Sequence, residues 1–247
     1  MSGAGYLNLL DILHEFRAVG EFARFANRAW TWPFTPRAQF RRSILLIPGF
    51  MAGDVTLYPF ADWLRSRGHN VFFSGIVANT DCPRSAIERL AGILRERSER
   101  AQDKIVLIGH SLGGIYAREL ARRMPAYVDQ VVLMGAPIRE PLKHSNPYVK
   151  MLAVLTRRIH ESRRGCSGDL NTVCGVNLSD PPPGIPETII YTKGDGVVDW
   201  TSCIESGPDV VAFEVDSTHC GLPYNLDTMR IIGERIERPS PPASTKN

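Results

Sequence analysis

Ser111 lies in a Gly-x-Ser-x-Gly pattern, Gly109-His110-Ser111-Leu112-Gly113, between an apolar run and a segment with helical spacing. A serine on so tight a turn from strand to helix needs small residues two positions to either side, and both are glycine. Such a turn lifts the hydroxyl above the carboxyl end of a sheet, and the unpaired N–H groups of the helix N-terminus lie behind it. The pattern therefore predicts that Ser111 is a nucleophile.

A serine hydroxyl is a weak nucleophile until a base takes its proton and a third group orients that base. For a nucleophile on this kind of turn, the acid and then the histidine follow in the sequence. Of the six histidines, only His219 follows the last predicted strand. His110 adjoins Ser111, and we expect its ring to point away from the turn. The order of residues therefore favours His219 as the general base.

Three aspartates are candidates for the group that orients the base. Asp195 directly follows a predicted strand and is flanked by glycines, as a sharp turn that aims a carboxylate requires. Asp199 is the alternative, although it can instead cap the short helix that follows it. Asp216 comes third because it is too near His219 along the chain. We predict Asp195, with Asp199 as the runner-up.

A tetrahedral intermediate also needs two N–H donors for its oxyanion. Leu112, the residue after the nucleophile, should supply one of them. The other should come from the loop after the first strand, Pro48-Gly49-Phe50-Met51, where Gly49 allows a close approach of the backbone. We predict the Phe50 N–H, with Met51 as the alternative donor. A plain turn between strand and helix is the other interpretation of this loop.

A parallel sheet is needed to bring these residues together. Strands are predicted from apolar runs at 43–48, 70–75, 105–108, 130–134, 187–192 and 209–215. Helices are predicted at 57–67, 84–102, 115–123 and 223–237. Strands that alternate with helices predict an α/β fold, with a mostly parallel central sheet and helices on both faces.

The segments outside this pattern set the predicted domain boundaries. Residues 1–42 form an N-terminal helix and connector, 43–237 the α/β domain, and 238–247 a disordered tail. Within the domain, residues 138–186 are far longer than the usual connection of about 2–6 residues, so we interpret them as a cap or lid. The N-terminal helix is predicted at 6–29, packed on the domain by a face that includes Leu9, Leu10, Leu13, Phe16, Phe22, Phe25 and Ala26.

Composition excludes several functional classes. Of the 247 residues, 43% are hydrophobic and 22% charged, as in globular proteins with a sizeable core. The net charge of +3 is too small, and too mixed in sign along the chain, to indicate nucleic-acid binding. No apolar run approaches the roughly 20 residues of a membrane span. Asp11, Glu15 and Glu21 interrupt the N-terminal segment, so we expect no signal peptide and a cytoplasmic protein.

The five cysteines show no Cys-x-x-Cys pattern that would indicate a metal site. Cys166 can pair with Cys174, and Cys203 with Cys220. Reduced thiols in a cytosolic protein are the equal alternative.

The chain resembles the α/β-hydrolase superfamily, and within it the lipase and carboxylesterase group, over about residues 43–237. The resemblance rests on Leu46-Ile47-Pro48-Gly49-Phe50, Gly109-His110-Ser111-Leu112-Gly113-Gly114, Gly194-Asp195-Gly196-Val197-Val198 and Thr218-His219-Cys220-Gly221. It implies the α/β-hydrolase fold with a cap after the equivalent of its sixth strand. It also implies Ser111 as nucleophile, His219 as base and Asp195 as acid, with no metal and no organic cofactor.

The resulting hypothesis is hydrolysis of a small-molecule or lipid ester through an acyl-enzyme, with at most a transient contact with a lipid surface. Acyl transfer and thioester hydrolysis use the same three residues and are the alternatives. A binding protein that kept the fold without catalysis is a further, unfavoured alternative, because no member of the set is missing. Apolar residues that can line an acyl pocket, or belong to the core, are Leu57, Tyr58, Phe60, Tyr148, Met151, Leu152 and Leu155.

Overall fold

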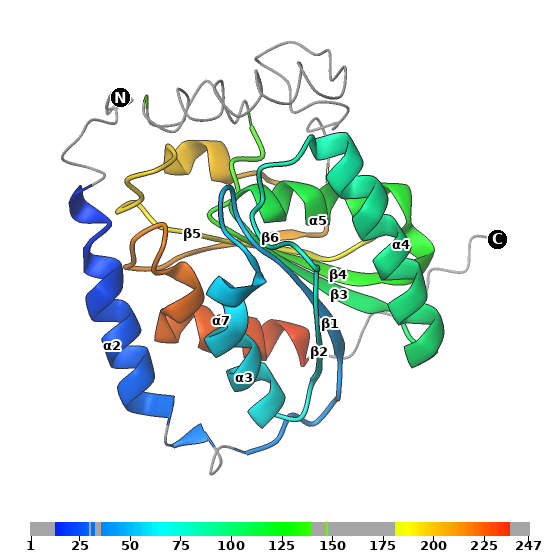
Figure 1. Cartoon of the computed structure of the whole chain (residues 1–247), viewed down its shortest axis with the longest axis horizontal. Coiled ribbons are helices and arrows are strands. Elements are labelled where there is room, and N and C mark those ends of the chain that lie inside the picture. The colour runs from blue at the N-terminus through cyan, green and yellow to red at the C-terminus, as the bar shows by residue number, and fades with distance from the viewer. Residues whose placement is uncertain (1–12, 30, 33–35, 140–146, 148–180, 238–247) are drawn as a thin grey trace.

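A six-stranded, wholly parallel sheet forms the centre of the computed structural model, which describes residues 13–29, 31–32, 36–139, 147 and 181–237 (Figure 1). The strand order is β2-β1-β3-β4-β5-β6. The strands are β1 (Ser43–Ile47), β2 (Asn70–Phe73), β3 (Ile105–His110), β4 (Val128–Met134), β5 (Glu187–Tyr191) and β6 (Val210–Glu214). The predicted α/β fold is confirmed.

Helices cover both faces of this sheet (Figure 1). One face packs against α2 (Arg17–Ala29), α3 (Tyr58–Ser66) and α7 (Leu226–Ile236), and the other against α4 (Pro83–Ala101) and α5 (Leu112–Arg123). Successive residues of a strand point to opposite faces, so Ile44 and Leu46 enter the first core while Leu45 and Ile47 enter the second. Because both faces are covered, β1 is buried throughout and its sequence is a continuous apolar run.

The strand order reverses between β1 and β3, and this reversal positions the candidate site. The segment after β1 leads to α3 on one face of the sheet, whereas the turn after β3 leads to α5 on the other. Loops that diverge in this way open a crevice at the carboxyl ends of two neighbouring strands. Ser111 follows β3 and the loop 48–53 follows β1, so both lie at this crevice.

Several predicted elements differ at their ends by up to three residues. Strand β2 ends at Phe73 and β4 begins at Val128. Two helix starts are separate 3-10 turns, η2 (Asp54–Leu57) before α3 and η5 (Leu222–Tyr224) before α7. Further 3-10 turns are η3 (Pro125–Tyr127) and η4 (Trp200–Cys203).

The N-terminal helix packs on the domain by a different face from the one predicted. Phe25 is buried beside the rings of Trp32 and Tyr224, as expected, but Leu13 and Phe16 are exposed. Glu21, one turn before Phe25, is buried instead. The prediction was wrong here because a carboxylate can be buried when it finds N–H and O–H partners, and spacing alone does not reveal them.

Most of the predicted cap lies outside the described residues. Tyr148, Met151, Leu152 and Leu155 belong to that part, as do Cys166, Cys174 and the tail 238–247. Within the part of the chain that the structure describes, no helix combines the length and the apolar character that crossing a bilayer requires.

Candidate active site

The turn between β3 and α5 holds Ser111 in a strained conformation. Its backbone has φ 53° and ψ −123°, a combination that residues with a side chain seldom adopt. A Cβ on Gly109 would lie 2.3 Å from the Gly113 carbonyl oxygen, and one on Gly113 would lie 2.2 Å from the Ile47 carbonyl oxygen. The expected need for small residues on either side of the serine is therefore confirmed.

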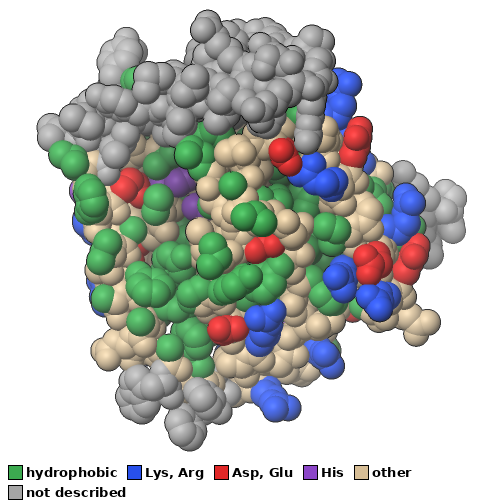
Figure 2. All heavy atoms as spheres, viewed as in Figure 1, with side chains coloured by type: hydrophobic (Ala, Val, Ile, Leu, Met, Phe, Trp, Pro, Cys, Tyr) green, Lys and Arg blue, Asp and Glu red, His purple; other side chains and the backbone are tan. Residues whose placement is uncertain are grey.

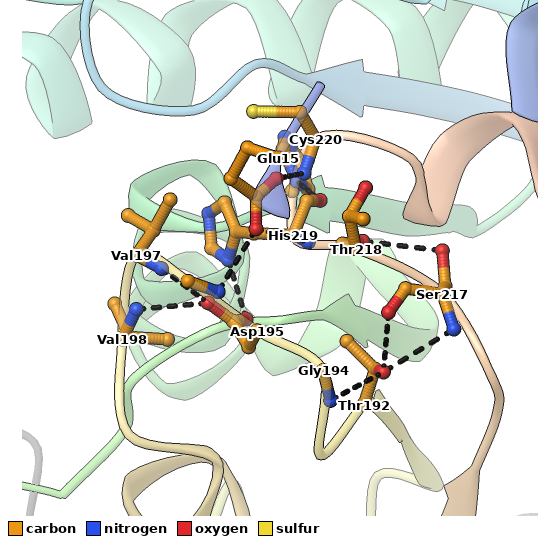
Figure 3. A network of polar contacts seen from close by, with 12 residues as sticks. Glu15, Thr192, Gly194, Asp195, Val197, Val198, Ser217, Thr218, His219 and Cys220 are labelled. Atoms are coloured by element: carbon orange, nitrogen blue, oxygen red, sulfur yellow. Dashed lines mark hydrogen bonds and ion pairs between the residues drawn. The ribbon is translucent and has the colours of Figure 1, made fainter. Parts of the chain in front are cut away.

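His219 and Asp195 form a buried pair beside this turn. His219 Nδ1 lies 2.6 Å from Asp195 Oδ2, and the side chains are 4% and 1% exposed. A carboxylate can only accept, so Nδ1 carries the proton and Nε2 is left as the basic nitrogen. The other oxygen, Asp195 Oδ1, accepts the N–H groups of Val197 at 2.9 Å and Val198 at 2.8 Å (Figure 3). The carboxylate is thus fixed by its own loop.

The two rival aspartates have other partners. Asp199 Oδ1 accepts the Thr201 N–H at 2.9 Å and caps η4, as its alternative interpretation expected. Asp216 is 90% exposed and lies 3.5 Å from Arg17. Of the three candidates, the structure brings only Asp195 against His219.

His110 lies against the His219 loop, so the expectation that its ring points away from the site is wrong. Its Nε2 donates to the His219 carbonyl oxygen over 2.9 Å, and the two ring centroids are 4.9 Å apart. Burial lowers the pKa of His110 to about 3, with a further contribution from the neighbouring His219 ring. His110 is therefore a neutral donor at ordinary pH, and it ties the His219 loop to the residue before Ser111.

The charges around His219 favour its protonated form. Burial by itself lowers the pKa of this imidazole, but the carboxylates of Asp195 and Glu15 outweigh burial and raise the pKa above its ordinary value. A histidine whose protonated form is stabilised by neighbouring carboxylates is suited to act as a general base.

Ser111 and His219 are neighbours without being bonded. Ser111 is 8% exposed, and among the described residues no hydrogen bond joins its hydroxyl to the His219 ring. The link between them runs through His110, which is adjacent to Ser111 and bonded to the His219 backbone. Catalytic hydrogen bonds are often long or unformed until a substrate is bound.

The loop after β1 packs directly on the turn that carries Ser111, since a Cβ on Gly49 would lie 3.0 Å from Ser111 Cβ. The side-chain amide of Asn79, which is buried, donates to the Pro48 carbonyl oxygen at 2.8 Å. The Asn79 carbonyl oxygen accepts the Met51 N–H at 3.1 Å, so this alternative oxyanion donor is already engaged. Within the described part of the chain, the Phe50 N–H has no such acceptor.

Leu112 is the first residue of α5, so its N–H has no partner within the helix. The N–H groups of Phe50 and Leu112 therefore both come from backbone next to Ser111.

Three of the side chains that the sequence suggested for an acyl pocket lie in the described residues. Leu57 and Phe60 belong to the core, whereas Tyr58 is exposed.

Four residues support the site although the sequence did not indicate them. The carboxylates of Glu15 and Glu21 accept hydrogen bonds from the loops that carry Asp195 and His219. In the sequence these glutamates are only interruptions of an apolar segment. The supporting roles of Asn79 and His110 were equally hidden, because their partners are distant in sequence or belong to the backbone.

The free state of two cysteines excludes one of the two possible disulfide bridges. Cys203 and Cys220 are both free thiols, the first buried and the second exposed, so the bridge between them is wrong. In the described residues, no three His, Cys, Asp or Glu side chains converge as a group that could hold a metal ion.

Comparison with known proteins extends these observations. A family model described as "PGAP1-like alpha/beta domain" matches residues 74–188, which include Ser111 and end before Asp195 and His219. No curated protein sequence matches the chain.

Solved structures with similar folds include lipase B of Aspergillus fumigatus, with 17% identity and a TM-score of 0.58 over 83% of this chain. The chain spans only 54% of that lipase. Lipase BlEst2 of Bacillus licheniformis, in its mature form, has 14% identity and a TM-score of 0.59, over 82% of this chain and 94% of its own. Polyneuridine aldehyde esterase has 15% identity and a TM-score of 0.52, over 81% of this chain and 100% of its own. At such identities the likeness shows the fold alone.

Proposed function

We propose that this chain, which has the α/β-hydrolase fold, is a serine hydrolase that cleaves carboxylic esters through an acyl-enzyme. The observation that carries the proposal is a strained serine beside a buried histidine–aspartate pair. Strain of this kind persists only where the surrounding structure enforces it, and it gathers at functional sites. Ser111 is the proposed nucleophile, His219 the base and Asp195 the group that orients the base.

In the first half of the reaction, His219 Nε2 takes the Ser111 proton as Oγ bonds to the acyl carbon. The carbonyl electron pair moves to oxygen, and the N–H groups of Phe50 and Leu112 donate to the resulting oxyanion. When this intermediate collapses, the ester C–O bond breaks and the proton on His219 passes to the departing alcohol. The acyl group remains on Ser111.

In the second half, water attacks the acyl carbon while His219 takes one of its protons. Collapse of the second intermediate releases the carboxylic acid and returns the proton to Ser111 Oγ. Asp195 stays ionised throughout and stabilises the imidazolium that forms twice in each cycle. Ser111 Oγ must come within hydrogen-bond distance of His219 Nε2 when the ester is bound.

Exposed apolar side chains next to the Phe50 loop favour an ester with an apolar acyl group. Met51 is 50% exposed, Val55 64% and Tyr58 48%, and Val77 in the loop after β2 is 91% exposed. Figure 2 shows hydrophobic side chains gathered over the face of the molecule formed by α2 and α3. Contact with an acyl chain would remove part of this surface from water, which is favourable for an apolar chain.

The test is hydrolysis of p-nitrophenyl esters from acetate to palmitate by the wild-type chain and the Ser111→Ala variant. We expect wild-type turnover to fall by roughly 10⁴-fold or more in the variant at every chain length. A fluorophosphonate should label the wild type on residue 111 and leave the variant unlabelled. Circular dichroism checks that the variant is folded.

The outcome also sorts the substrate class. Preference for short, soluble esters identifies an esterase, and preference for long chains a lipase. Faster loss of a thioester, or transfer to an added alcohol in place of water, assigns one of the two alternative activities. Turnover that Ser111→Ala leaves unchanged would contradict the proposal.

A further inference from the structure

Glu15 lies just before α2 and accepts hydrogen bonds from two loops that are distant in sequence. Its Oε1 accepts the N–H of Gly196 at 2.9 Å and that of His219 at 3.0 Å. Its Oε2 accepts the Cys220 N–H at 2.8 Å. Gly196 follows the proposed acid, and His219 is the proposed base. One carboxylate therefore joins the backbones of the two loops that must hold Asp195 and His219 together (Figure 3).

Glu21 also accepts hydrogen bonds from the loop that carries His219. Its Oε2 accepts the Ser217 hydroxyl at 2.9 Å, and its Oε1 accepts the Thr218 N–H at 3.1 Å. The side chain is buried, and a Cβ on Gly221 would lie 1.4 Å from Oε2, so the loop closes tightly around this carboxylate. Residues 217–220 thus rest on two carboxylates of the N-terminal segment.

Both backbone polar groups of His219 and the Nδ1–H of its ring therefore have hydrogen-bond partners. Its N–H donates to Glu15, its carbonyl oxygen accepts from His110, and its ring donates to Asp195. Hydrogen bonds to an ionised acceptor are stronger than those between neutral groups. A misplacement of about 1 Å can cost on the order of 10²-fold in rate, so the anchor of this loop matters for turnover.

We propose that Glu15 is a positioning residue of the proposed hydrolase: by accepting N–H groups from both loops, it sets the distance and orientation of His219 relative to Asp195. The inference rests on the proposed function. Glu15 acts through the backbone of the two loops, because its two oxygens accept three backbone N–H groups of those loops.

The substitution Glu15→Gln separates this role from simple packing. Glutamine has the same shape, but it has a single oxygen acceptor, and its amide group would meet N–H donors with N–H. If the amide oxygen takes the place of Oε1, the Cys220 N–H loses its acceptor; if it takes the place of Oε2, the N–H groups of Gly196 and His219 lose theirs. The substitution also removes a negative charge near the His219 ring, which is faced by Asp195, Glu15 and His110, with Glu21 beneath the same loop. Arg17 and Asp216 pair nearby at the surface.

The experiment measures hydrolysis of p-nitrophenyl butyrate by the wild type, Glu15→Gln, Glu15→Asp and the control Glu99→Gln. Glu99 is an exposed glutamate near the end of α4, so its substitution changes the net charge equally away from the site. We expect kcat to fall about 10- to 100-fold in Glu15→Gln, with KM within about 3-fold of wild type. Glu15→Asp keeps both oxygens and should recover part of kcat, and Glu99→Gln should match wild type.

The pH profile supplies a readout that lost packing would not move. Because Glu15 helps to raise the pKa of His219, the acid limb of kcat/KM should move to lower pH in Glu15→Gln. If Glu15→Gln does not fold, Glu15→Asp carries the test, with a smaller fall in kcat expected.

Three outcomes overturn the inference, and they are distinguishable. If Ser111→Ala is inactive while kcat and the pH profile of the Glu15 variants match wild type, the positioning role is wrong and the proposed function stands. The positioning role is equally wrong if the variants lose only free energy of unfolding. If Ser111→Ala keeps wild-type turnover, the proposed function fails, and the positioning role fails with it.

Discussion

At the scale of single residues, the two oxygens of Asp195 have separate partners. Oδ2 bonds to His219 Nδ1, and Oδ1 accepts two backbone N–H groups of its own loop. An acid that only needed to be near the base would not require the second set of bonds. The arrangement fixes the direction of the carboxylate, and hence the tautomer and orientation of the imidazole.

Asp195→Asn and Asp199→Asn form a matched pair that tests this assignment. The first substitution places an amide against His219 Nδ1 and favours the wrong tautomer, so we expect kcat to fall by roughly 10⁴-fold. The second keeps a side-chain oxygen that can accept the Thr201 N–H and cap η4, so we expect a change in stability of at most about 0.5 kcal/mol and kcat within a few-fold of wild type. Ester hydrolysis and urea unfolding of both variants check these values. An equal loss of kcat in the two would contradict Asp195 as the orienting acid.

At the scale of elements, the turn from β3 to α5 depends on backbone contacts that no side chain can enter. Gly113 lies in the first turn of α5 against the carbonyl groups of Ile47 and Pro48, which end the strand beside it. The turn that carries Ser111 and the loop after β1 are therefore packed as one unit.

Gly113→Ala and Gly92→Ala test that packing, because both glycines lie in helices. Helix propensity alone predicts a gain of up to about 1 kcal/mol for each. At Gly92 nothing lies within 4 Å of the new Cβ, so we expect that gain and unchanged activity. At Gly113 the clash should reverse the sign, with a loss of about 1–3 kcal/mol and of most ester hydrolysis. Urea unfolding measures both, and a gain at Gly113 would contradict the packing described.

The elements were largely predictable from sequence because their signals are local. Strands such as Ser43–Ile47 are continuous apolar runs, and the Gly-x-Ser-x-Gly pattern defines its own turn. The order of Ser111, Asp195 and His219 along the chain then limited the candidates for each role. The supports were not predictable, because Glu15 and His110 bond to backbone groups, and the sequence of a loop does not say where its N–H and carbonyl groups point.

At the scale of the whole molecule, a buried charge cluster joins α5 to β5 and the segment after η4. Arg118 Nε lies 3.2 Å from Glu187 Oε2, and Arg118 also pairs with Glu205. The side chains of Arg118 and Glu187 are 2% and 0% exposed. Burial, opposed by Arg118 and assisted by Glu205, raises the pKa of Glu187 to about 7.

This shift predicts a pH dependence of stability. Between the ordinary pKa of 4.5 and about 7, the folded protein binds more protons at Glu187 than the unfolded chain does. Stability from this group is therefore greatest below pH 4.5 and falls as pH rises through 7, by up to about 3 kcal/mol.

Glu187→Gln removes that titration. The free energies of unfolding of the variant and the wild type should be similar at pH 5, and the variant should be more stable by about 1–3 kcal/mol at pH 8. Urea unfolding at both pH values checks this, with the exposed Glu96→Gln as control. Parallel pH dependence in Glu187→Gln and wild type would rule the assignment out.

Because Gly221 packs closely against Glu21, we expect positions 21 and 221 to covary among homologous chains. Homologous chains that place a larger residue at position 221 must move the carboxylate of a glutamate at 21, shorten that side chain or move the helix. The two positions, 200 residues apart in the chain, should consequently change together or not at all. Frequent independent variation would mean that the carboxylate has another way to lie.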